Sequence, residues 1–449
     1  MSTDLEIAIK ALSAKGTRYS QLWDYYDGRQ PLIYNNEKLR EIFHGLNARF
    51  TLNWCAVVVD SILDRMSIID ASVASDDSVS AVLADLWALS GLADDVDTIH
   101  EEIGVCGESF VIAWVNPASE EIEAYHNDAR LVHVEYDGSN PRKARFAAKW
   151  WKDDTDRYNL TLYYPDRLEY YRAKSRTQIG AMAASSKDFE PLPDMPIAPN
   201  PFGVIPVFHF RSNKRKAMSQ IANVLEPQDA INKLMADMMV AAEFGAYKQR
   251  YVISSVGIGK GKVKNSPNEI WDLPAGMEGE QSTQVGQFDA TDLQNYLNAI
   301  DKIAMSIGVI TRTPKHYFYT QGGDPSGEAL IALESPLNKK TQRMINTLIP
   351  TWQRLAAFLL ALDGRQIAAQ DVFVNYETPA TVQPRTQAEI RKLNRESGLP
   401  LTTILRDEGW TDEELAQMDE DLQSEATSQA NYADAALGAA QRQFDQGLT

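Results

Sequence analysis

The sequence has few cysteines, no long apolar run and a deficit of positive charge. Two cysteines in 449 residues cannot form a disulfide framework, which indicates a chain made in a reducing compartment. The longest uninterrupted apolar run, Leu355–Leu362, has eight residues, against the roughly 20 that a membrane-spanning helix needs. The first residues lack a basic stretch followed by an apolar core, so no secretory signal and no membrane partner are expected.

Acidic residues outnumber basic ones, 62 to 44, which leaves a net charge of −18. A protein that holds DNA tightly needs a cationic surface to displace counterions, and this chain as a whole repels phosphate. The excess is marked at the C-terminus, where nine acids and one base follow residue 410. Length and composition otherwise indicate a folded protein of about three domains.

No catalytic motif is recognisable, and the sequence predicts no enzyme, no metal site and no cofactor. Gly257–Lys262 is the nearest approach to a phosphate-binding loop, but Val263 stands where the magnesium-binding hydroxyl belongs. The six histidines are scattered, and His133 is interpreted as a residue on a sheet face. Asp153–Asp156 lacks the glycine and closing glutamate of a calcium loop and is interpreted as a turn.

The N-terminal half changes from a helical to a strand-like pattern. Residues 1–70 are predicted to be helical, with apolar residues at helical spacing over Asn53–Met66, and a third helix is predicted over Ser78–His100. From Gly104 to Phe210 the period is two, which predicts an antiparallel sheet. The clearest strands are Ser109–Val115, Arg130–Tyr136 and Tyr158–Tyr164, and residues 173–200 are predicted to form a loop.

Helices return in the C-terminal half. One begins at Pro227 and another covers residues 289–307, and between them residues 251–287 are predicted to form short strands and turns. Gly308–Gly327 has no helical period, and uninterrupted loops of that length inside a domain are usually functional or disordered.

A long helix is predicted to follow, capped by Ser326, reaching Leu362 and interrupted at Pro336 and Pro350. An alternating strand over Asp371–Glu377, two short helices and a poorly ordered acidic tail complete the chain.

The chain also carries seven short segments, none of which encodes chemistry: Leu22–Leu32, Asn53–Arg65, Gly107–Val111, Gly203–Phe210, Glu226–Asn232, Thr313–Phe318 and Pro325–Leu330. In their order and spacing, and in the order of the predicted elements, they resemble the portal proteins of tailed double-stranded DNA bacteriophages. The resemblance is greatest to the branch common in phages of actinobacteria, and it covers about residues 17–410.

The resemblance implies an α+β fold, the phage portal fold, with a helical and β-rich wing, a two-helix stem, a small α/β clip, a long kinked helix and a helical crown. The implied boundaries are 1–213 for the wing, 214–252 and 288–308 for the stem helices, 253–287 for the clip, 309–326 for the tunnel loop, 327–383 for the long kinked wing helix and strand, and 384–449 for the crown and a disordered tail.

The resemblance further implies a non-enzymatic virion protein, made in the host cytoplasm, that forms a homo-oligomeric ring of about twelve copies at one capsid vertex. Double-stranded DNA would pass through the ring without sequence specificity during packaging and ejection. The implied protein partners are the terminase large subunit, the major capsid or scaffolding protein, and the head–tail adaptor. Two alternatives stay open: another phage structural protein such as a minor capsid component, and a metal-dependent phage nuclease.

Two sets of residues are expected to contact DNA or a partner. The tunnel loop carries bases and aromatic or amide side chains suited to brief phosphate contact, unless it is a surface excursion. The clip carries lysines that contact DNA or an acidic protein surface, unless they belong to a solvated hairpin. The tunnel-loop residues are Arg312, Lys315, Tyr317, Tyr319 and Gln321, and the clip residues are Lys260, Lys262 and Lys264.

Overall fold

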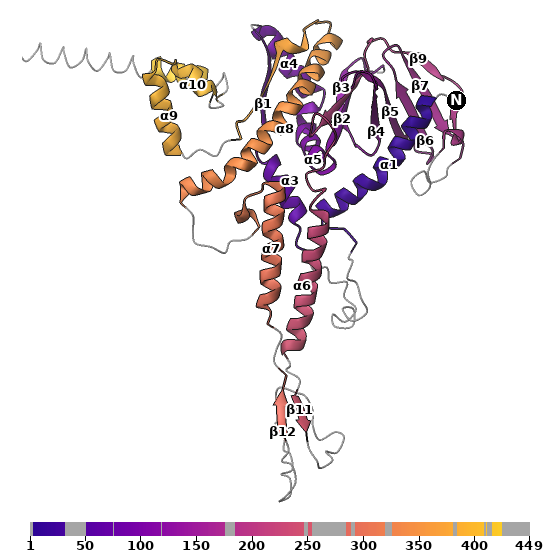
Figure 1. Cartoon of the computed structure of the whole chain (residues 1–449). Coiled ribbons are helices and arrows are strands. Elements are labelled where there is room, and N and C mark those ends of the chain that lie inside the picture. Colours follow the sequence, from indigo (N-terminus) through magenta and orange to yellow (C-terminus); the bar gives the residue numbers. More distant parts are fainter. Residues whose placement is uncertain are drawn as a thin grey trace, which may run out of the picture. The chain divides into compact units, whose positions relative to one another are not determined.

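The computed structural model describes residues 3–31, 51–74, 76–117, 119–175, 185–246, 250–253, 284–288, 292–318, 326–379, 384–407, 410 and 415–423, and the structural statements below concern these residues. They form a mixture of helices and strands, which confirms the predicted class (Figure 1). The chain divides into two compact units. Unit 1 comprises residues 1–63 and 90–323, and unit 2 comprises residues 64–89 and 324–449.

The larger sheet of unit 1 is antiparallel, with its strands in the order β4–β5–β6–β7–β8 and with β9 paired to the same edge of β7 as β8. The last two strands lie in the stretch predicted to be a loop. That prediction was wrong at this point, because strands of three residues are too short to show a period of two. The bounds are β4 (Val132–Tyr136), β5 (Ala144–Lys152), β6 (Tyr158–Tyr163), β7 (Arg167–Ala173), β8 (Phe189–Pro191) and β9 (Ile197–Pro199).

Helix α1 (Thr3–Tyr26) covers one face of this sheet with its first half. Its buried residues follow helical spacing, and they pack on alternate residues of β5 and β6, which point to one face because the strand period is two. The packed side chains are Leu5, Ala8, Ile9 and Leu12 of the helix and Phe146, Ala148, Leu160 and Leu162 of the sheet.

The smaller sheet of unit 1 has the order β10–β2–β3, formed by β10 (Val207–Arg211), β2 (Glu108–Val115) and β3 (Ile122–Asn127). The central strand β2 is buried along most of its length, which explains its continuous apolar run. It follows directly on helix α5 (Leu92–Cys106), and Gly107 joins the two with φ +89°.

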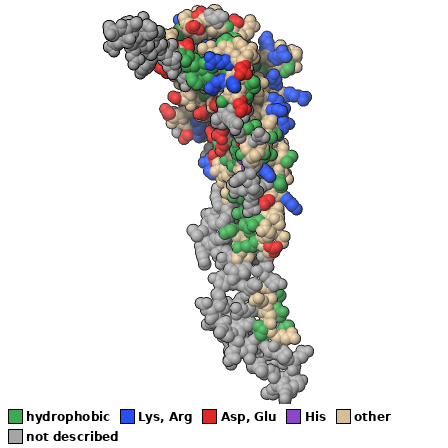
Figure 2. Space-filling view, turned by 90° about the vertical axis from the view of Figure 1, so that its left-hand side faces the viewer, with side chains coloured by type: hydrophobic (Ala, Val, Ile, Leu, Met, Phe, Trp, Pro, Cys, Tyr) green, Lys and Arg blue, Asp and Glu red, His purple; other side chains and the backbone are tan. Residues whose placement is uncertain are grey.

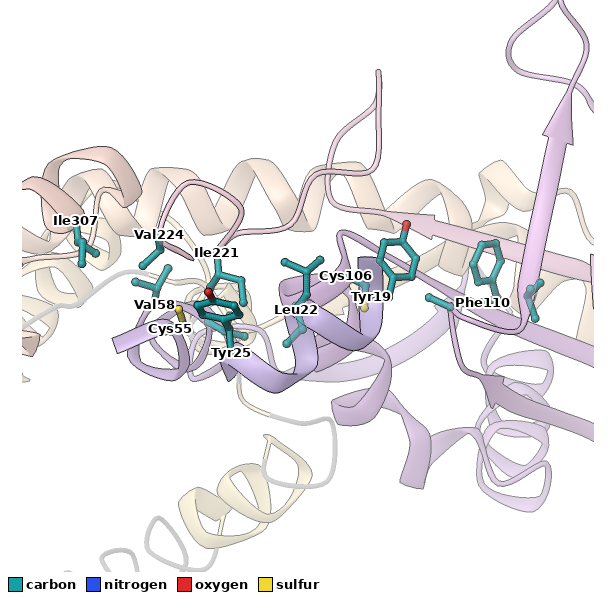
Figure 3. Close-up of a cluster of buried hydrophobic side chains, with 14 of the residues drawn as sticks. Tyr19, Leu22, Tyr25, Cys55, Val58, Cys106, Phe110, Ile221, Val224 and Ile307 are labelled. Atoms are coloured by element: carbon teal, nitrogen blue, oxygen red, sulfur yellow. The ribbon is translucent and has the colours of Figure 1, made fainter. Parts of the chain in front are cut away.

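A second apolar core joins the other half of α1 to helices α3 (Trp54–Leu63), α6 (Leu225–Ala246) and α7 (Gln294–Thr311). Figure 3 shows Tyr19, Leu22 and Tyr25 of α1 on the same cluster as Val58 and Ile307. The base of the two long helices is therefore built into the core of unit 1.

Helices α6 and α7 run side by side away from that core, as Figure 1 shows. Between them in the chain lies a two-stranded antiparallel ribbon, β11 (Arg250–Ile253) with β12 (Gln284–Gln287). Gly286 lies beside Tyr251, and a Cβ there would approach the end of its ring to 2.3 Å, so a larger residue would require the exposed tyrosine side chain to move.

Unit 2 is built on a two-stranded antiparallel sheet of β1 (Ile68–Val73) and β13 (Val372–Tyr376), with helices α4 (Asp77–Leu89) and α8 (Gly327–Leu362) packed on it. Trp352 of α8 is fully buried, packs against Trp87 with the two rings tilted by 39°, and donates a hydrogen bond to the Tyr376 hydroxyl (2.7 Å). Further along the chain come helices α9 (Pro384–Glu396) and α10 (Leu401–Asp407) and a helical segment over residues 415–423.

Two predicted boundaries were wrong. The helix predicted over Ser78–His100 is two helices, α4 and α5, because Gly91 adopts φ +80° and ends the first; the two belong to different units. Helix α8 is capped by Ser326 as predicted, but it continues through Pro336 and Pro350. Figure 1 shows that it bends, since proline removes one backbone hydrogen bond and crowds the preceding turn without requiring a break.

Candidate functional site

The candidate site begins where α7 ends. The helix was predicted to stop at residue 308, with an irregular loop from 309, but it continues to Thr311. The Thr311 hydroxyl donates to the Ile307 carbonyl (2.7 Å) and lies 3.0 Å from the Thr313 hydroxyl, within hydrogen-bonding distance, which holds the last turn together. Arg312 then adopts a left-handed conformation, φ +63°, and reverses the chain.

The chain after Arg312 folds back onto the helix it has just left. Phe318 is buried against Trp54 of α3, with ring centroids 5.5 Å apart, and lies over Gly308. A Cβ on Gly308 would come within 2.9 Å of the Thr313 carbonyl oxygen, so this close return depends on glycine. Residues 312–318 are therefore an anchored turn.

Because the turn is anchored by its buried residues, the side chains predicted to contact DNA are left at the surface. Arg312 and Lys315 are exposed, while Thr313 and Phe318 beside them are buried. Tyr317 is half-buried and packs against the His316 ring. The anchored turn therefore exposes the charges of Arg312 and Lys315 to solvent.

The other predicted contact residues lie outside the described residues. These are Tyr319 and Gln321 of the predicted tunnel loop and Lys260, Lys262 and Lys264 of the predicted clip. The tail predicted to be poorly ordered, over residues 424–449, lies outside the described residues as well.

The side of α7 away from its buried residues carries apolar side chains in solvent. Ile300, Ala304 and Ile307 are buried, whereas Val309 and Ile310 are 80% and 53% exposed. Met305 is exposed on this side as well, Leu297 is exposed in line with the buried Ile300 and Ala304, and Figure 2 shows apolar side chains at the surface of the α6–α7 region. Large apolar side chains exposed together on one helix indicate a site of association.

Helix α6 is fixed to the rest of unit 1 by a buried polar clamp. Gln228 accepts a hydrogen bond from the Trp54 amide (2.9 Å) and donates one to the Leu52 carbonyl, and Asn232 accepts one from the Leu52 amide (3.0 Å). Tyr25 of α1 donates to Asp229 (2.6 Å). The start of α6 therefore satisfies the backbone of the segment that leads into α3.

A buried ionic cluster ties α1 to the smaller sheet. Glu108 of β2 lies 2.5 Å from the Lys15 ammonium and 2.8 Å from His209 Nε2, and it accepts a hydrogen bond from Tyr19 (2.7 Å). Burial alone would raise the pKa of Glu108, but Lys15 and the His209 hydrogen bond outweigh it and hold that pKa well below its usual range. Glu108 is therefore ionised inside the protein.

His209 in this cluster is neutral at pH 7, because burial lowers its pKa to about 4. Its two ring nitrogens lie 2.8 Å from Glu108 and 3.0 Å from the Tyr136 hydroxyl. Both contacts are satisfied when Nε2–H donates to the carboxylate and Tyr136 donates to Nδ1. Periodicity gave no sign of this cluster, since its members come from four separate segments.

The remaining sequence interpretations can be placed directly. His133 lies on β4 with Nε2 3.0 Å from Glu135, as expected of a sheet-face residue. Asp153 accepts hydrogen bonds from the Thr155 hydroxyl, Asn159 and Arg172, which makes it the centre of a turn, as predicted.

Within the described ranges no group of three or more His, Cys, Asp or Glu side chains is placed to hold a metal ion. Among the same residues, no helix has the length and apolar character needed to cross a membrane.

A family model described as phage portal protein, SPP1 Gp6-like, matches residues 6–428. Two curated relatives are the portal proteins of Mycobacterium phage L5 and Mycobacterium phage D29, which are 23% and 24% identical over 306 residues. Each alignment covers 64% of this chain and 59% of the relative, so the chain matches about three fifths of the length of these relatives.

Solved structures matched by this chain include a chain from the virion of a native gene transfer agent (GTA) particle, with a TM-score of 0.42 and 11% identity. A chain from the neck of an empty GTA particle, computed with C6 symmetry, gives a TM-score of 0.41 and 14% identity. Both comparisons cover 82% of this chain and 90% of the other.

Proposed function

Because this chain belongs to the SPP1 Gp6-like family of phage portal proteins, we propose that copies of it form a closed ring at one vertex of a capsid. The axis of the ring is the conduit for DNA during packaging and ejection. The same ring docks the terminase motor first and the head–tail adaptor later. The chain acts as a structural component of the virion in this proposal, without a catalytic step of its own.

The observation that supports a ring is the exposed apolar side of α7. Met305, Val309 and Ile310 lie on the helix surface away from its buried residues, and nothing in the described part of the chain covers them. A neighbouring copy would bury them. Contacts that repeat head to tail close into a ring when the rotation per subunit divides a full turn.

The regions implied by the family are assigned to the observed elements as part of this proposal. Helices α6 and α7 form the stem, the ribbon β11–β12 begins and ends the clip, and the turn after Arg312 begins the tunnel loop. The sheets of unit 1 and the elements of unit 2 up to β13 form the wing, and the chain from α9 onward forms the crown.

The net charge of −18 suits a channel through which DNA slides better than a protein that binds DNA tightly. Duplex DNA carries about one negative charge per 1.7 Å of its axis, and a strongly cationic channel would release counterions and hold it in place. Walls of like charge keep the duplex from adhering, so that a few cations can make transient contacts as it slides.

Electron microscopy of the purified protein, combined with its mass in solution, tests the proposal. We expect closed rings with an axial channel at micromolar concentration and moderate salt. A stable 50.2 kDa monomer under those conditions would contradict it. Incubation with plasmid DNA and Mg²⁺ or Mn²⁺ tests the nuclease alternative, and intact plasmid is the expected result.

A further inference from the structure

The loop between β10 and α6 carries a concentrated positive charge in this acidic protein. Arg211, Lys214, Arg215 and Lys216 supply four cations within six residues, and the last three are exposed. Across the described part of the chain, none of the four forms an ion pair with an acidic side chain. Their charge is therefore available to a partner.

The loop is held in a fixed conformation against the end of α5. The Ser212 hydroxyl donates to the Met218 carbonyl (2.7 Å) and accepts from the Met218 amide (3.1 Å), which closes the loop on itself. The Ser212 amide donates to the Gly107 carbonyl (2.9 Å), and the Gln220 amide donates to the Gly104 carbonyl (3.0 Å). The two sides of the loop are thus hydrogen-bonded to one helix end.

Three further contacts fix the course of the loop that carries the cations. Gly107 leaves no side chain in the path of the loop, since a Cβ there would lie 2.5 Å from the Met218 backbone. Asn213 accepts a hydrogen bond from the Arg215 amide (3.0 Å), which sets the turn between the lysines. Arg211 lies over the Tyr136 ring, 4.9 Å from its centroid, at the base of the loop. A preformed loop loses little conformational freedom when it binds.

The composition of the loop favours a phosphate backbone over a protein surface. Interfaces between proteins have apolar or aromatic centres and are depleted in lysine, whereas residues 213–216 contain three cations, one amide and no aromatic side chain. Contacts to nucleic-acid phosphates come mainly from arginine and lysine at exposed sites. Duplex DNA is the polyanion that the proposed function brings to this protein.

We propose that the basic loop, residues 211–216, binds the phosphate backbone of duplex DNA without reading its sequence. It is a contact separate from the Arg312 turn and from the lysines of the predicted clip. The proposal relies on the proposed function only for the identity of the polyanion.

Salt-dependent binding of the full-length protein to a random-sequence 30-base-pair duplex tests this contact. In fluorescence anisotropy we expect the variant Lys214→Gln, Arg215→Gln, Lys216→Gln to bind about tenfold more weakly or worse near 0.1 M salt. The slope of log K against log salt should become shallower by about 0.9 for each phosphate that the variant no longer neutralises. The conservative variant Lys214→Arg, Lys216→Arg should keep wild-type binding.

A matched control removes the same charge elsewhere in unit 1. Lys10, Lys174 and Lys187 are exposed, and their replacement by glutamine should leave affinity and slope near wild type. Equal weakening in both triple variants would overturn the proposal, because binding would then follow net charge alone. Unchanged DNA binding in the loop variant would overturn it as well, and a simultaneous loss of terminase binding would identify an acidic protein surface as the partner.

Electron microscopy and thermal unfolding of the same samples separate this proposal from the proposed function. Rings that bind DNA independently of the loop would overturn only the loop contact. Loop-dependent DNA binding by a protein that never forms rings would overturn only the ring. The loop variant should unfold at the wild-type temperature, since its three side chains are exposed and form no hydrogen bond, ion pair or ring contact with the described residues.

Discussion

Lys15 on α1 places its ammonium nitrogen 2.5 Å from Oε1 of Glu108, the first residue of β2, and both side chains are largely removed from solvent. The two residues are 93 positions apart (108 − 15), so the pair joins the N-terminal helix to the smaller sheet. Leaving either charge without the other inside the protein is costly. The cluster therefore contributes to how stability responds to pH, together with His100 of α5, whose pKa burial also lowers to about 4.

We expect unit 1 to lose stability as the pH falls from about 6.5 to about 4. The pKa of His209 is lowered from 6.5 to about 4 by burial, so the unfolded state binds a proton that the folded state does not. Below about pH 4.5 the depressed pKa of Glu108 adds to the loss, since the unfolded carboxyl is protonated first. His209→Gln should flatten the profile of unfolding temperature between pH 6.5 and 4, and an unchanged slope would contradict this.

Gly107→Ala should be strongly destabilising, by about 3 kcal/mol or more, because it combines backbone strain with a steric clash. Two other glycines separate these effects. Gly91 has a positive φ but open space around it, so Gly91→Ala should cost about 1 kcal/mol, and Gly138→Ala should cost almost nothing. Chemical denaturation of the three variants measures the series, and a cost for Gly107→Ala no larger than that for Gly91→Ala would show that the Met218 backbone moves aside.

Gln228→Leu should destabilise the base of α6 by about 2–4 kcal/mol, because the Trp54 amide and the Leu52 carbonyl lose buried partners. Gln294→Leu is the matched control, since Gln294 is exposed on α7 and its side chain donates to the equally exposed Asn298 (3.1 Å). Hydrogen exchange at Trp54 reports the effect locally. Full amide protection in the Gln228 variant would show that another group replaces the side chain.

Met305→Gln with Val309→Gln should prevent or weaken ring assembly without unfolding the subunit. Both side chains are exposed in the single chain, so their replacement removes only contacts with a neighbouring copy. Met195→Gln with Ile197→Gln removes exposed apolar side chains at β9, away from α7, and should leave rings intact. Mass measurement in solution distinguishes the two pairs, and normal rings from the first pair would place the interface elsewhere.

Arg312→Gln with Lys315→Gln should impair DNA packaging or retention while leaving ring assembly and subunit stability nearly unchanged. Exposed charges contribute about 0–1 kcal/mol to folding, and the turn that carries these two is held by Thr311, Thr313 and Phe318. The length of packaged DNA and the phage titre measure the effect. Normal values of both would show that this turn does not contact the moving duplex.

Local periodicity was enough to find most regular elements. The apolar spacing over Asn53–Met66 predicted α3, and alternation over Ser109–Val115 and Tyr158–Tyr164 predicted β2 and β6 within a residue or so. Ser326 was recognised as a cap because its hydroxyl reaches the backbone three residues later, a contact within a single turn. Signals of this kind depend only on neighbours in the chain.

The features that hold unit 1 together depend on residues far apart in the chain, and only the tertiary structure decided them. Gly91 divides one apolar stretch between two units, and Gln228 supplies a hydrogen-bonding partner to backbone 174 residues away. Glu108 is ionised because Lys15 and His209 meet it below the surface. Composition and periodicity determine which segments form helices and strands, whereas buried charges and polar clamps depend on which segments meet, and that is set by packing in three dimensions.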